Sequence, residues 1–579
     1  MPVRRVPVGR AEGSVGCVVR CNGRGCRMTV HPALAPAVTS GVIDEIDLDA
    51  LGGLSLLFGV PDIGPQLQFV LALALKAGPD GNTCLELRSV DAASVSSGMT
   101  VPDDADGWAA LLRACPQLVE VSDGAAAVRR VPFVLDGARL YTARTHHEEL
   151  SVGSSLRMLR DGRLEVVLGG PGTGKTTYIA GELIRLFTED TDGTIKLALV
   201  APTGKAARRM RQSLMRALAR SDAPDDVKKR ILDSSKAQTV HKLLRLSPGM
   251  TPRFQKNAKK QLKLNLVIVD EASMMSLSLM YRLLDALPSD ARMWLVGDPD
   301  QLASVDAGTV LGDIDRMIKS QSAGTWKFER RTVQHRYPEE STINTLVKAV
   351  RDARDDNKDD IDAIIATLSG ASGDVEWVDP VADGEKLSAL AAEVVGVANA
   401  VVGLASKGDA AGALAALSTV QVLCAHRNGT LGVQGWNRTV QSAVPGSLAE
   451  PFYIGRPVLV SRNDDRLGVA NGDVGIVCLV NGQKVVAFEG LDGPVTIPLN
   501  RLPEVETVYA MTIHKSQGSE YEHAIVVLPT KASRILTREL LYTGISRPTK
   551  KLTIVATEES IRRAVGLPIR RATGLAARL

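Results

Sequence analysis

The middle of the chain carries three short apolar runs, each four or five residues long and each followed by glycine, acidic or other polar residues. They are Leu164 to Leu168, Leu266 to Val269 and Met293 to Val296. Apolar runs of this length, bounded by turn residues, are typical of buried strands. The longer segments between them leave room for helices. The pattern therefore predicts an α/β fold in which parallel sheets are flanked by helices.

Two other regions have different patterns. Residues 45–130 show helical spacing of apolar residues, clearest from Leu67 to Leu75 and ending at Gly78 and Pro79. Near the other end, short apolar runs fall between residues 455 and 504, and Asn481-Gly482 between two of them is a strong hairpin signal. We therefore expect a small helical domain at residues 41–138 and a strand-rich insert at about 455–504.

The run that ends at Leu168 leads into a glycine-rich loop with the pattern Gly-x-x-x-x-Gly-Lys-Thr, and a helix-like run follows from Tyr178. Glycines between a strand and a helix let backbone N–H groups converge on phosphate oxygens. Lys175 can reach the β and γ phosphates, and the Thr176 hydroxyl can bind Mg²⁺. A glycine-rich turn without a ligand is the weaker alternative. ATP and Mg²⁺ are therefore expected on Gly170, Pro171, Gly172, Thr173, Gly174, Lys175, Thr176 and Thr177.

Two further strand ends carry polar side chains. Asp270 and Glu271 follow the run at 266–269, where one carboxylate can hold the metal and its neighbour can orient or deprotonate the attacking water. We predict Asp270 as the metal ligand beside Thr176, and Glu271 as the base. An acidic pair that only caps the next helix is the alternative. Gln301, just past the run at 293–296, is a candidate sensor of the γ phosphate.

Length and composition limit the class of protein. The chain has 579 residues, 45% of them apolar, and a formal net charge of +4. Because single cores stop growing near about 250–300 residues, several domains are expected. The charge is too small to indicate a polyanionic partner by itself. The richest apolar stretch, Leu387 to Ala405, is broken by Glu393 and Asn399, so no membrane partner is expected.

The cysteines and the first forty residues add two expectations. Seven scattered cysteines form no disulfide framework, which fits a reducing cytoplasm, and the spacing of Cys17, Cys21, Cys26 and His31 fits no common zinc pattern. Residues 1–40 carry six arginines against a single acid, Glu12, with many glycines and prolines. This composition predicts a basic flexible tail rather than a secretory signal.

Further segments resemble the motifs of superfamily 1 helicases. They are Ala201 to Ala207, Thr239 to Leu244, Gly297 to Leu302, Gln334 to Tyr337, Thr512 to Ser519 and Tyr542 to Arg547. Within that superfamily the chain is most similar to RecD, the smaller motor subunit of the RecBCD helicase-nuclease (exonuclease V). The segments that carry this closer similarity are Pro132 to Tyr141, Gly297 to Asp313, Leu423 to Arg427, Trp436 to Arg438 and Leu536 to Tyr542. The resemblance covers about residues 45 to 575.

The resemblance implies an ATP-dependent DNA helicase built from two RecA-like domains, at residues 139–325 and 326–579, with the insert at 455–504 being SH3-like. Arg336 and Arg547 would reach the γ phosphate from the second domain as arginine fingers, and Gly518 would lie beside the nucleotide. Single-stranded DNA contacts are implied for eight residues, because hydroxyl, imidazole and ammonium groups can hold phosphates without sequence preference. These residues are Pro202, Thr203, Lys205, Thr239, His241, Thr512, His514 and Lys515.

By resemblance alone, movement on DNA runs 5′ to 3′ and the partners are RecB-like and RecC-like subunits, with residues 41–138 docking on the latter. The role is in double-strand break repair and recombination. The expected location is the cytoplasm, on the nucleoid when the protein is bound to DNA. Three other functions stay open: a stand-alone helicase, a regulatory ATP-binding subunit with weak motor activity, and a nucleotide-gated scaffold.

Two positions depart from the family pattern. No glutamine occurs between Gln117 and Gln212, where RecD-like helicases carry a glutamine-containing segment that recognises adenine. Pro548 follows Arg547 where a small residue is usual, and it biases Arg547 toward extended backbone geometry.

A run of basic residues before the strand at 266–269 fits either DNA binding or a solvated hairpin. It comprises Arg253, Phe254, Lys256, Lys259, Lys260 and Lys263.

Overall fold

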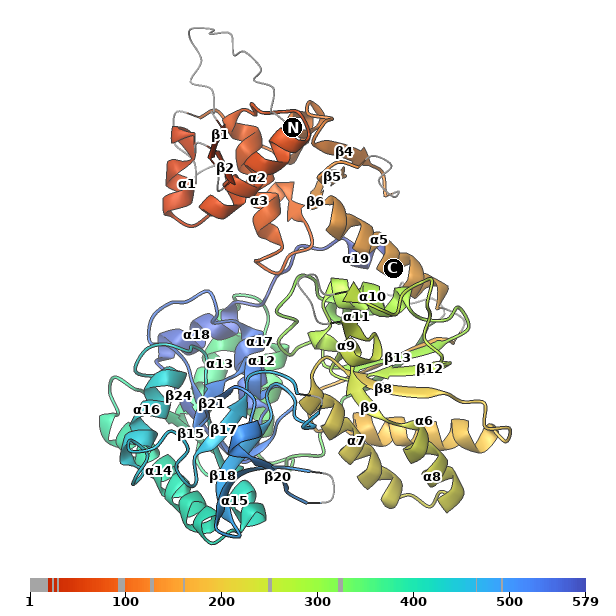
Figure 1. Ribbon diagram of the computed structural model, residues 1–579. Helices are drawn as coiled ribbons and strands as arrows, with labels where there is room; N and C mark the ends of the chain where they lie inside the picture. Colours follow the sequence, from red (N-terminus) through yellow and green to blue (C-terminus); the bar gives the residue numbers. More distant parts are fainter. Residues whose placement is uncertain are drawn as a thin grey trace.

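The computed structural model describes residues 19–22, 25–28, 31–91, 99–124, 130–159, 162–247, 253–320, 326–464, 466–490 and 493–579. An N-terminal domain lies above two α/β domains that face each other (Figure 1). A separate antiparallel sheet is inserted in the second of these. The parallel sheets flanked by helices confirm the α/β fold expected from the apolar runs.

The N-terminal domain contains helices and also a sheet. Its helices are α1 (Ala35–Thr39), α2 (Glu45–Leu57), α3 (Pro65–Ala77) and α4 (Ala105–Arg113). A four-stranded mixed sheet has the order β3-β6-β5-β4, formed by Leu85–Glu86, Arg139–Thr142, Phe133–Asp136 and Val119–Ser122. The expected helical domain was therefore incomplete, because these strands are two to four residues long and leave no periodic signal.

The expectation of a flexible tail over residues 1–40 is wrong at its end. Residues Pro32–Leu34 form a 3-10 turn that leads into α1, and Leu34 and Ala37 are buried in the N-terminal core. Pro32 and Pro36 each sit in a first helical turn, where a missing N–H costs nothing. Farther upstream, β1 (Val19–Asn22) and β2 (Gly25–Met28) pair antiparallel. Residues 1–18 lie outside the described residues.

The first α/β domain is built on a six-stranded parallel sheet with the order β14-β7-β13-β12-β8-β9. Alternate strand residues face opposite layers: Val166 packs toward α5, α10 and α11, and Val167 packs toward α6, α7 and α8. The strands are Lys327–Arg331, Leu164–Gly169, Arg292–Gly297, Leu266–Val269, Leu197–Ala201 and Ala237–Thr239. The helices are α5 (Ala143–Met158), α6 (Lys175–Glu189), α7 (Gly204–Ala219), α8 (Asp225–Ser234), α10 (Leu277–Asp285) and α11 (Val310–Lys319). The three predicted strands are confirmed.

The expected domain boundary at residue 326 is one strand too early. Strand β14 pairs in parallel with β7, so residues 327–331 complete the first sheet. The sequence hides this strand because four of its five residues, Lys327, Glu329, Arg330 and Arg331, are charged. An edge strand tolerates charged side chains that a central strand would not.

The second α/β domain has a five-stranded parallel sheet with the order β15-β24-β23-β16-β22. These strands are Val375–Val378, Pro548–Val555, Tyr521–Val527, Val420–Cys424 and Ala510–Thr512. The helices are α12 (Thr342–Asp352), α13 (Lys358–Ser369), α14 (Gly384–Ser406), α15 (Ala410–Leu417), α16 (Val433–Ala443), α17 (Arg538–Ile545) and α18 (Glu558–Gly566).

Helix α14 has the length and the apolar composition of a membrane span, with a mean hydropathy of 1.8 over its most apolar window. It is the one such helix in the described part of the chain. Leu390, Val394 and Ala398 pack in the core of the second sheet, and Val401 and Ala405 pack against the insert. These five side chains therefore serve contacts within this domain, while 22% of the most apolar window is buried in all.

The insert forms a five-stranded antiparallel sheet with the order β20-β19-β18-β17-β21. Its strands are Val495–Pro498, Gln483–Phe488, Val474–Val480, Pro457–Val460 and Val505–Thr507. Asn481 and Gly482, both at positive φ (50° and 76°), join β18 to β19, which confirms the predicted hairpin. Strand β21 carries the sheet three residues beyond the expected end at 504.

The last residues of the chain leave the second domain. After α18, the backbone crosses to the first domain, where α19 (Leu575–Arg578) lies beside α5 and α11 (Figure 1). Leu575 is buried in the core of the first domain. The expected second domain therefore ends before residue 579, since its terminal segment packs elsewhere.

Candidate active site between the two α/β domains

The glycine-rich loop connects β7 to α6 as the sequence predicts. Gly172 and Gly174 have φ values of 80° and 78°, a region that favours glycine. The Lys175 ammonium lies inside the loop and donates to the carbonyls of Gly169 (2.6 Å) and Gly170 (2.9 Å). A Cβ on Gly172 would come within 2.7 Å of the Arg336 Cβ, so only glycine lets Arg336 approach this closely.

A cleft of about 1010 Å³ opens beside this loop between the two domains. Most of the predicted nucleotide and catalytic residues line it together: Pro171, Gly172, Thr173, Gly174, Lys175, Thr176, Thr177, Asp270, Glu271, Gln301, Arg336, Gly518 and Arg547. Gly170 is not among the lining residues, and its carbonyl instead accepts from Lys175 and from the Thr173 hydroxyl. The structure thus gathers residues that are up to 376 positions apart, from Pro171 to Arg547, around one cavity.

Asp270 and Glu271 project from the end of β12 into this cleft. Burial and the adjacent Glu271 raise the pKa of the Asp270 carboxyl, and the nearby Lys175 opposes that shift. Glu271 has a φ of 51°, a left-handed conformation that costs a non-glycine residue on the order of 1 kcal/mol. Strain of this kind is common at active sites, because the surrounding structure must hold the side chain in a required direction.

The donor set fits Mg²⁺. A threonine hydroxyl at Thr176 and a carboxylate at Asp270 are hard oxygen ligands, which this ion prefers. The described residues contain no cluster of three or more His, Cys, Asp or Glu side chains placed to bind a metal. Such a sparse set suits an ion that keeps several waters and also binds nucleotide phosphates.

Gln301 and Arg547 form a direct bridge between the domains. Arg547, only 3% exposed, donates from Nη2 to the Gln301 Oε1 (2.7 Å) and from Nε to the Thr543 carbonyl (2.9 Å). Asp298 accepts from the Gln301 amide (3.0 Å) and from the Tyr542 hydroxyl (3.0 Å). The predicted sensor and the predicted finger therefore belong to one hydrogen-bonded network.

Arg336 lies in the cleft. The resemblance implied that it comes from the second domain, but it does not. It follows β14 on the linker between the domains, and the two residues before it form hydrogen bonds with the phosphate loop. The Gln334 amide donates to the Pro171 carbonyl (2.7 Å), and the His335 N–H donates to the Gly172 carbonyl (2.9 Å). The Arg336 guanidinium pairs with Glu520 and donates to the Ser546 carbonyl (2.6 Å).

Pro548 does not keep Arg547 out of the cleft. Pro548 begins β24, a position where a strand tolerates proline. Its carbonyl accepts from the Tyr337 hydroxyl (2.6 Å), which fixes the backbone just after Arg547. The departure from the family pattern is therefore compatible with a finger that reaches the site.

Sequence reasoning missed several residues that line the cleft. They are Arg209, Arg331, His335, Glu489 and Glu520, among others. His335 lies within the motif Gln334 to Tyr337, and Glu520 directly follows the motif Thr512 to Ser519, so their positions were a usable signal. Glu489 follows β19 of the insert, and no local pattern indicates that the insert reaches the nucleotide cleft.

The candidate DNA residues lie where strands end. Pro202, Thr203 and Lys205 follow β8, Thr239 ends β9 with His241 just beyond, and Thr512 ends β22 with His514 and Lys515 just beyond. Each threonine hydroxyl accepts from a backbone N–H three residues later: Ala206 (3.2 Å), Lys242 (3.1 Å) and Lys515 (3.3 Å). A hydroxyl that accepts in this way keeps its own hydrogen to donate.

The charged members of this set have distinct environments. Burial, together with Arg209, lowers the pKa of Lys205 to about 7. Lys515 pairs with Glu506 at 3.0 Å, and the same carboxylate pairs with Arg427 at 3.3 Å. The His241 ring lies 5.9 Å from the Phe254 ring, which belongs to the β10–β11 hairpin (Leu246–Ser247 and Arg253–Phe254). The basic run therefore begins in a hairpin beside His241, which leaves both of its interpretations open.

Comparisons with known proteins agree with this geometry. An AAA domain matches residues 155–307, and a UvrD-like helicase C-terminal domain matches residues 507–555. The RecBCD enzyme subunit RecD of Mycobacterium tuberculosis is 35% identical, over 93% of this chain and 95% of that protein. The RecD subunit of Mycolicibacterium smegmatis is 36% identical, over 93% and 98%.

Two more distant similarities were found. The ATP-dependent RecD2 DNA helicase of Deinococcus radiodurans is 31% identical over 68% of this chain and 47% of that protein. Among solved structures, a Bacteroides Pif1 helicase bound to single-stranded DNA has a TM-score of 0.37 at 16% identity, covering 71% of this chain and 93% of that one.

Two domains of these types around one phosphate-loop cleft define a superfamily 1 helicase. Within that class, identity above 30% along nearly the whole length decides the relationship. The chain belongs to the RecD family.

Proposed function

We propose that this chain is an ATP-dependent helicase that moves along single-stranded DNA as the RecD subunit of a RecBCD-type helicase-nuclease. The two α/β domains act as RecA-like motor domains, and the insert is SH3-like. The observation that carries the proposal is the bridge from Arg547 to Gln301, because it links the second domain directly to the strand end beside the phosphate loop.

The predicted residues of the cleft serve four purposes: triphosphate binding, activation of water, stabilisation of charge and metal binding. The loop N–H groups and Lys175 hold the triphosphate, and Glu271 orients and deprotonates the attacking water. Arg547 and Arg336 stabilise negative charge on the transferring phosphoryl group. Thr176 and Asp270 would hold Mg²⁺, and the ion would offset negative charge on the phosphate.

Hydrolysis can be linked to movement because both domains contribute to the cleft. A γ phosphate that attracts Arg547 and Gln301 would change the contact between the domains, and its loss would reverse that change. The candidate DNA residues lie at strand ends in both domains. A change in the separation of Thr203 and Thr512 would therefore shift the DNA contact of the first domain relative to that of the second.

The subunit role is supported by the extent of the match. The similarity to the RecD subunits of Mycobacterium tuberculosis and Mycolicibacterium smegmatis covers at least 95% of their length, and the similarity to RecD2 covers less than half of that protein. Double-strand break repair, 5′ to 3′ movement, RecB-like and RecC-like partners and a cytoplasmic, nucleoid-associated location are proposed with that role. No membrane partner is proposed, since the buried apolar residues of α14 pack within the protein.

Two experiments test this function. Affinity capture of the tagged chain from its native cell should recover two large subunits in stoichiometric amounts, whereas recovery of the chain alone would favour a stand-alone helicase. The purified assembly, with its other motor inactivated, should unwind duplexes that carry a 5′ single-stranded tail and should fail on matched 3′-tailed duplexes. The opposite preference would overturn the proposed direction.

A further inference from the structure

The end of the chain forms a strap that touches three parts of the molecule. We define the C-terminal strap as residues 567–578, which run from α18 in the second domain, across the first domain, to α19 beside the N-terminal domain (Figure 1). Among the described residues, the side chain of Arg571 forms hydrogen bonds with neither the residues that line the nucleotide cleft nor the candidate DNA residues. Its side-chain hydrogen bonds go instead to one loop of the first domain.

That loop directly follows the Gln301 sensor. We call residues 303–308 the post-sensor loop. The Arg571 guanidinium donates to its carbonyls at Ser304 (2.6 Å), Asp306 (3.0 Å) and Gly308 (3.1 Å). Three carbonyls around one planar fork fix the path of a short loop, and a lysine ammonium, although it has three donors, lacks the spread, planar geometry of that fork.

The near end of the loop is tied to the ATP site. The Leu302 N–H donates to the Thr543 hydroxyl (3.0 Å), and the Leu302 carbonyl accepts from the Gln517 amide (2.9 Å). Leu302 adjoins Gln301, which accepts from Arg547. The position of the loop and the position of the sensor side chain are therefore linked through two consecutive residues.

The far end of the loop is tied to the N-terminal domain. The Gly308 N–H donates to the Gly81 carbonyl (3.0 Å). Gly81 has a φ of 86°, and a Cβ there would lie 2.8 Å from the Arg571 Cζ, so the glycine lets the N-terminal domain pack directly on the guanidinium. One residue further along the strap, the Ala572 N–H donates to the Asn82 Oδ1 (2.8 Å).

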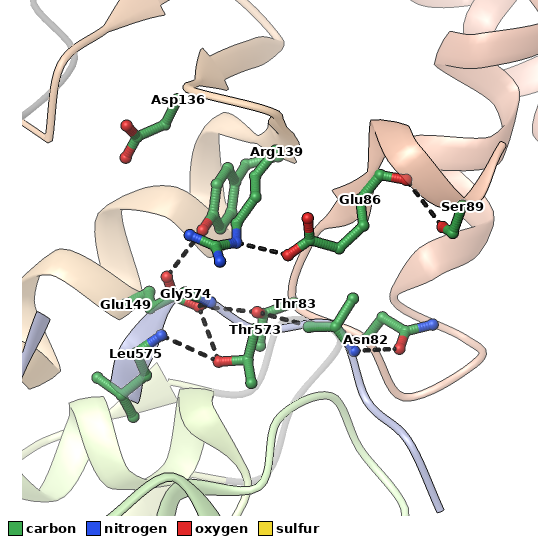
Figure 2. Close-up of polar contacts among 12 residues, drawn as sticks. Asn82, Thr83, Glu86, Ser89, Asp136, Arg139, Glu149, Thr573, Gly574 and Leu575 are labelled. Atoms are coloured by element: carbon green, nitrogen blue, oxygen red, sulfur yellow. Dashed lines mark hydrogen bonds and ion pairs between the residues drawn. The ribbon is translucent and has the colours of Figure 1, made fainter. Parts of the chain in front are cut away.

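A buried carboxylate anchors the rest of the strap (Figure 2). Glu149 of α5 is fully buried and accepts from the Thr83 hydroxyl (2.8 Å), the Gly574 N–H (3.1 Å) and the Arg578 Nε (3.0 Å). A buried charge is tolerated only when it is paired and hydrogen-bonded, so these contacts depend on one another. The strap, α5 and the N-terminal loop at 81–83 are joined by one network of hydrogen bonds.

We propose that Arg571 is a positioning residue for ATP hydrolysis, holding the post-sensor loop so that Gln301 meets the γ phosphate and making the N-terminal domain part of the same network. The inference rests on the proposed ATP hydrolysis. It assigns the C-terminal strap a coupling role between the ATP cleft and the domain that the family resemblance implies for partner docking.

Steady-state ATP hydrolysis by the full chain, with saturating single-stranded DNA, tests the positioning role. Arg571→Ala should lower kcat about tenfold, because displacement of a positioned group costs one to two orders of magnitude, while KM for ATP stays within about twofold. Arg571→Lys should recover little of the loss. The matched control is Arg570→Ala, which removes an exposed neighbour paired with Asp355 on the surface and should keep the wild-type kcat.

The outcomes separate the inference from the proposed function. No hydrolysis by the wild-type chain would count against the proposed function. Wild-type hydrolysis with an unchanged kcat in Arg571→Ala, or an equal loss in Arg570→Ala, would overturn the inference alone. If Arg571→Ala does not fold, Arg571→Lys decides, and a kcat equal to wild type in that variant contradicts the positioning role.

Hydrogen exchange tests the coupling directly. Mg²⁺ with a non-hydrolysable ATP analogue should slow amide exchange at residues 81–83 and 304–308 of the wild-type chain, and Arg571→Ala should remove the effect at 81–83. Protection confined to the phosphate loop in the wild-type chain would show that the N-terminal domain is not coupled to the cleft.

Discussion

Arg547 links the two domains directly, because its guanidinium reaches Gln301 from the second domain. Arg547→Ala should lower kcat for ATP by about 10²-fold or more and change ATP binding much less, since the contact matters most in the transition state. Arg547→Lys should rescue little. Pro548→Ala should change the rate only modestly, because Arg547 already reaches the cleft. Steady-state kinetics of the assembled complex with DNA measure these effects. An unaltered rate in Arg547→Ala would leave the finger role to Arg336 alone.

Glu271 is held in a strained conformation beside the phosphate loop. Glu271→Gln keeps the shape of the side chain and removes its basicity, so turnover should fall by about 10²-fold or more. ATP should still bind, because Lys175, Thr176 and Asp270 are unchanged. Equilibrium binding of a fluorescent ATP analogue, measured beside single-turnover hydrolysis, separates the two effects. Loss of binding together with turnover would make Glu271 a structural residue.

At the level of elements, β21 carries an acidic side chain onto the predicted DNA-binding face. Glu506 of this strand pairs with Arg427 after β16 and with Lys515 after β22. If Arg427 and Lys515 bind DNA as we propose, this carboxylate would compete with DNA phosphates for both cations. Exposed ion pairs contribute about 0.2–1 kcal/mol each, so Glu506→Gln should tighten single-stranded DNA binding by about two- to tenfold at low salt.

Fluorescence anisotropy with a labelled oligonucleotide measures that effect, and Glu504→Gln is its matched control. Glu504 is exposed two residues upstream, and no described residue forms an ion pair with its side chain. Equal affinities for Glu506→Gln and the wild-type chain would show that Arg427 and Lys515 do not contact DNA together.

Elements that depend on local sequence could be predicted, and those that depend on distant partners could not. The loop from Gly169 to Thr177 and the Asn481-Gly482 turn are set by glycines and their immediate neighbours, so the sequence reveals them. Strand β3 has two residues, and β4 pairs in parallel with β5 from a separate segment. Nothing in their own residues distinguishes such strands from loops, because their stability comes from the sheet.

At the scale of the whole molecule, the same limit explains the corrected boundaries. The sequence predicts two α/β domains in succession, but β14 and α19 cross the expected division. Arg578 pairs with Glu149 across 429 positions, and a composition shift cannot reveal such a contact. The phosphate loop, Asp270, Glu271 and Gln301 were predictable because they follow strands, and parallel strands bring their carboxyl ends to one edge of a sheet. Arg547 lies between α17 and β24, so only the family resemblance indicated it.

The central claim is that the cleft between the domains hydrolyses ATP in response to single-stranded DNA, and Lys175→Ala tests it most directly. The measurement is the ATP hydrolysis rate of the chain at saturating Mg-ATP, with and without single-stranded DNA, beside Lys196→Ala as an exposed lysine control in the same domain. We expect DNA to stimulate the wild-type chain and Lys196→Ala alike. In Lys175→Ala, hydrolysis should be lost while the melting temperature and partner assembly are kept. DNA-stimulated hydrolysis that persists in a folded Lys175→Ala would contradict the account.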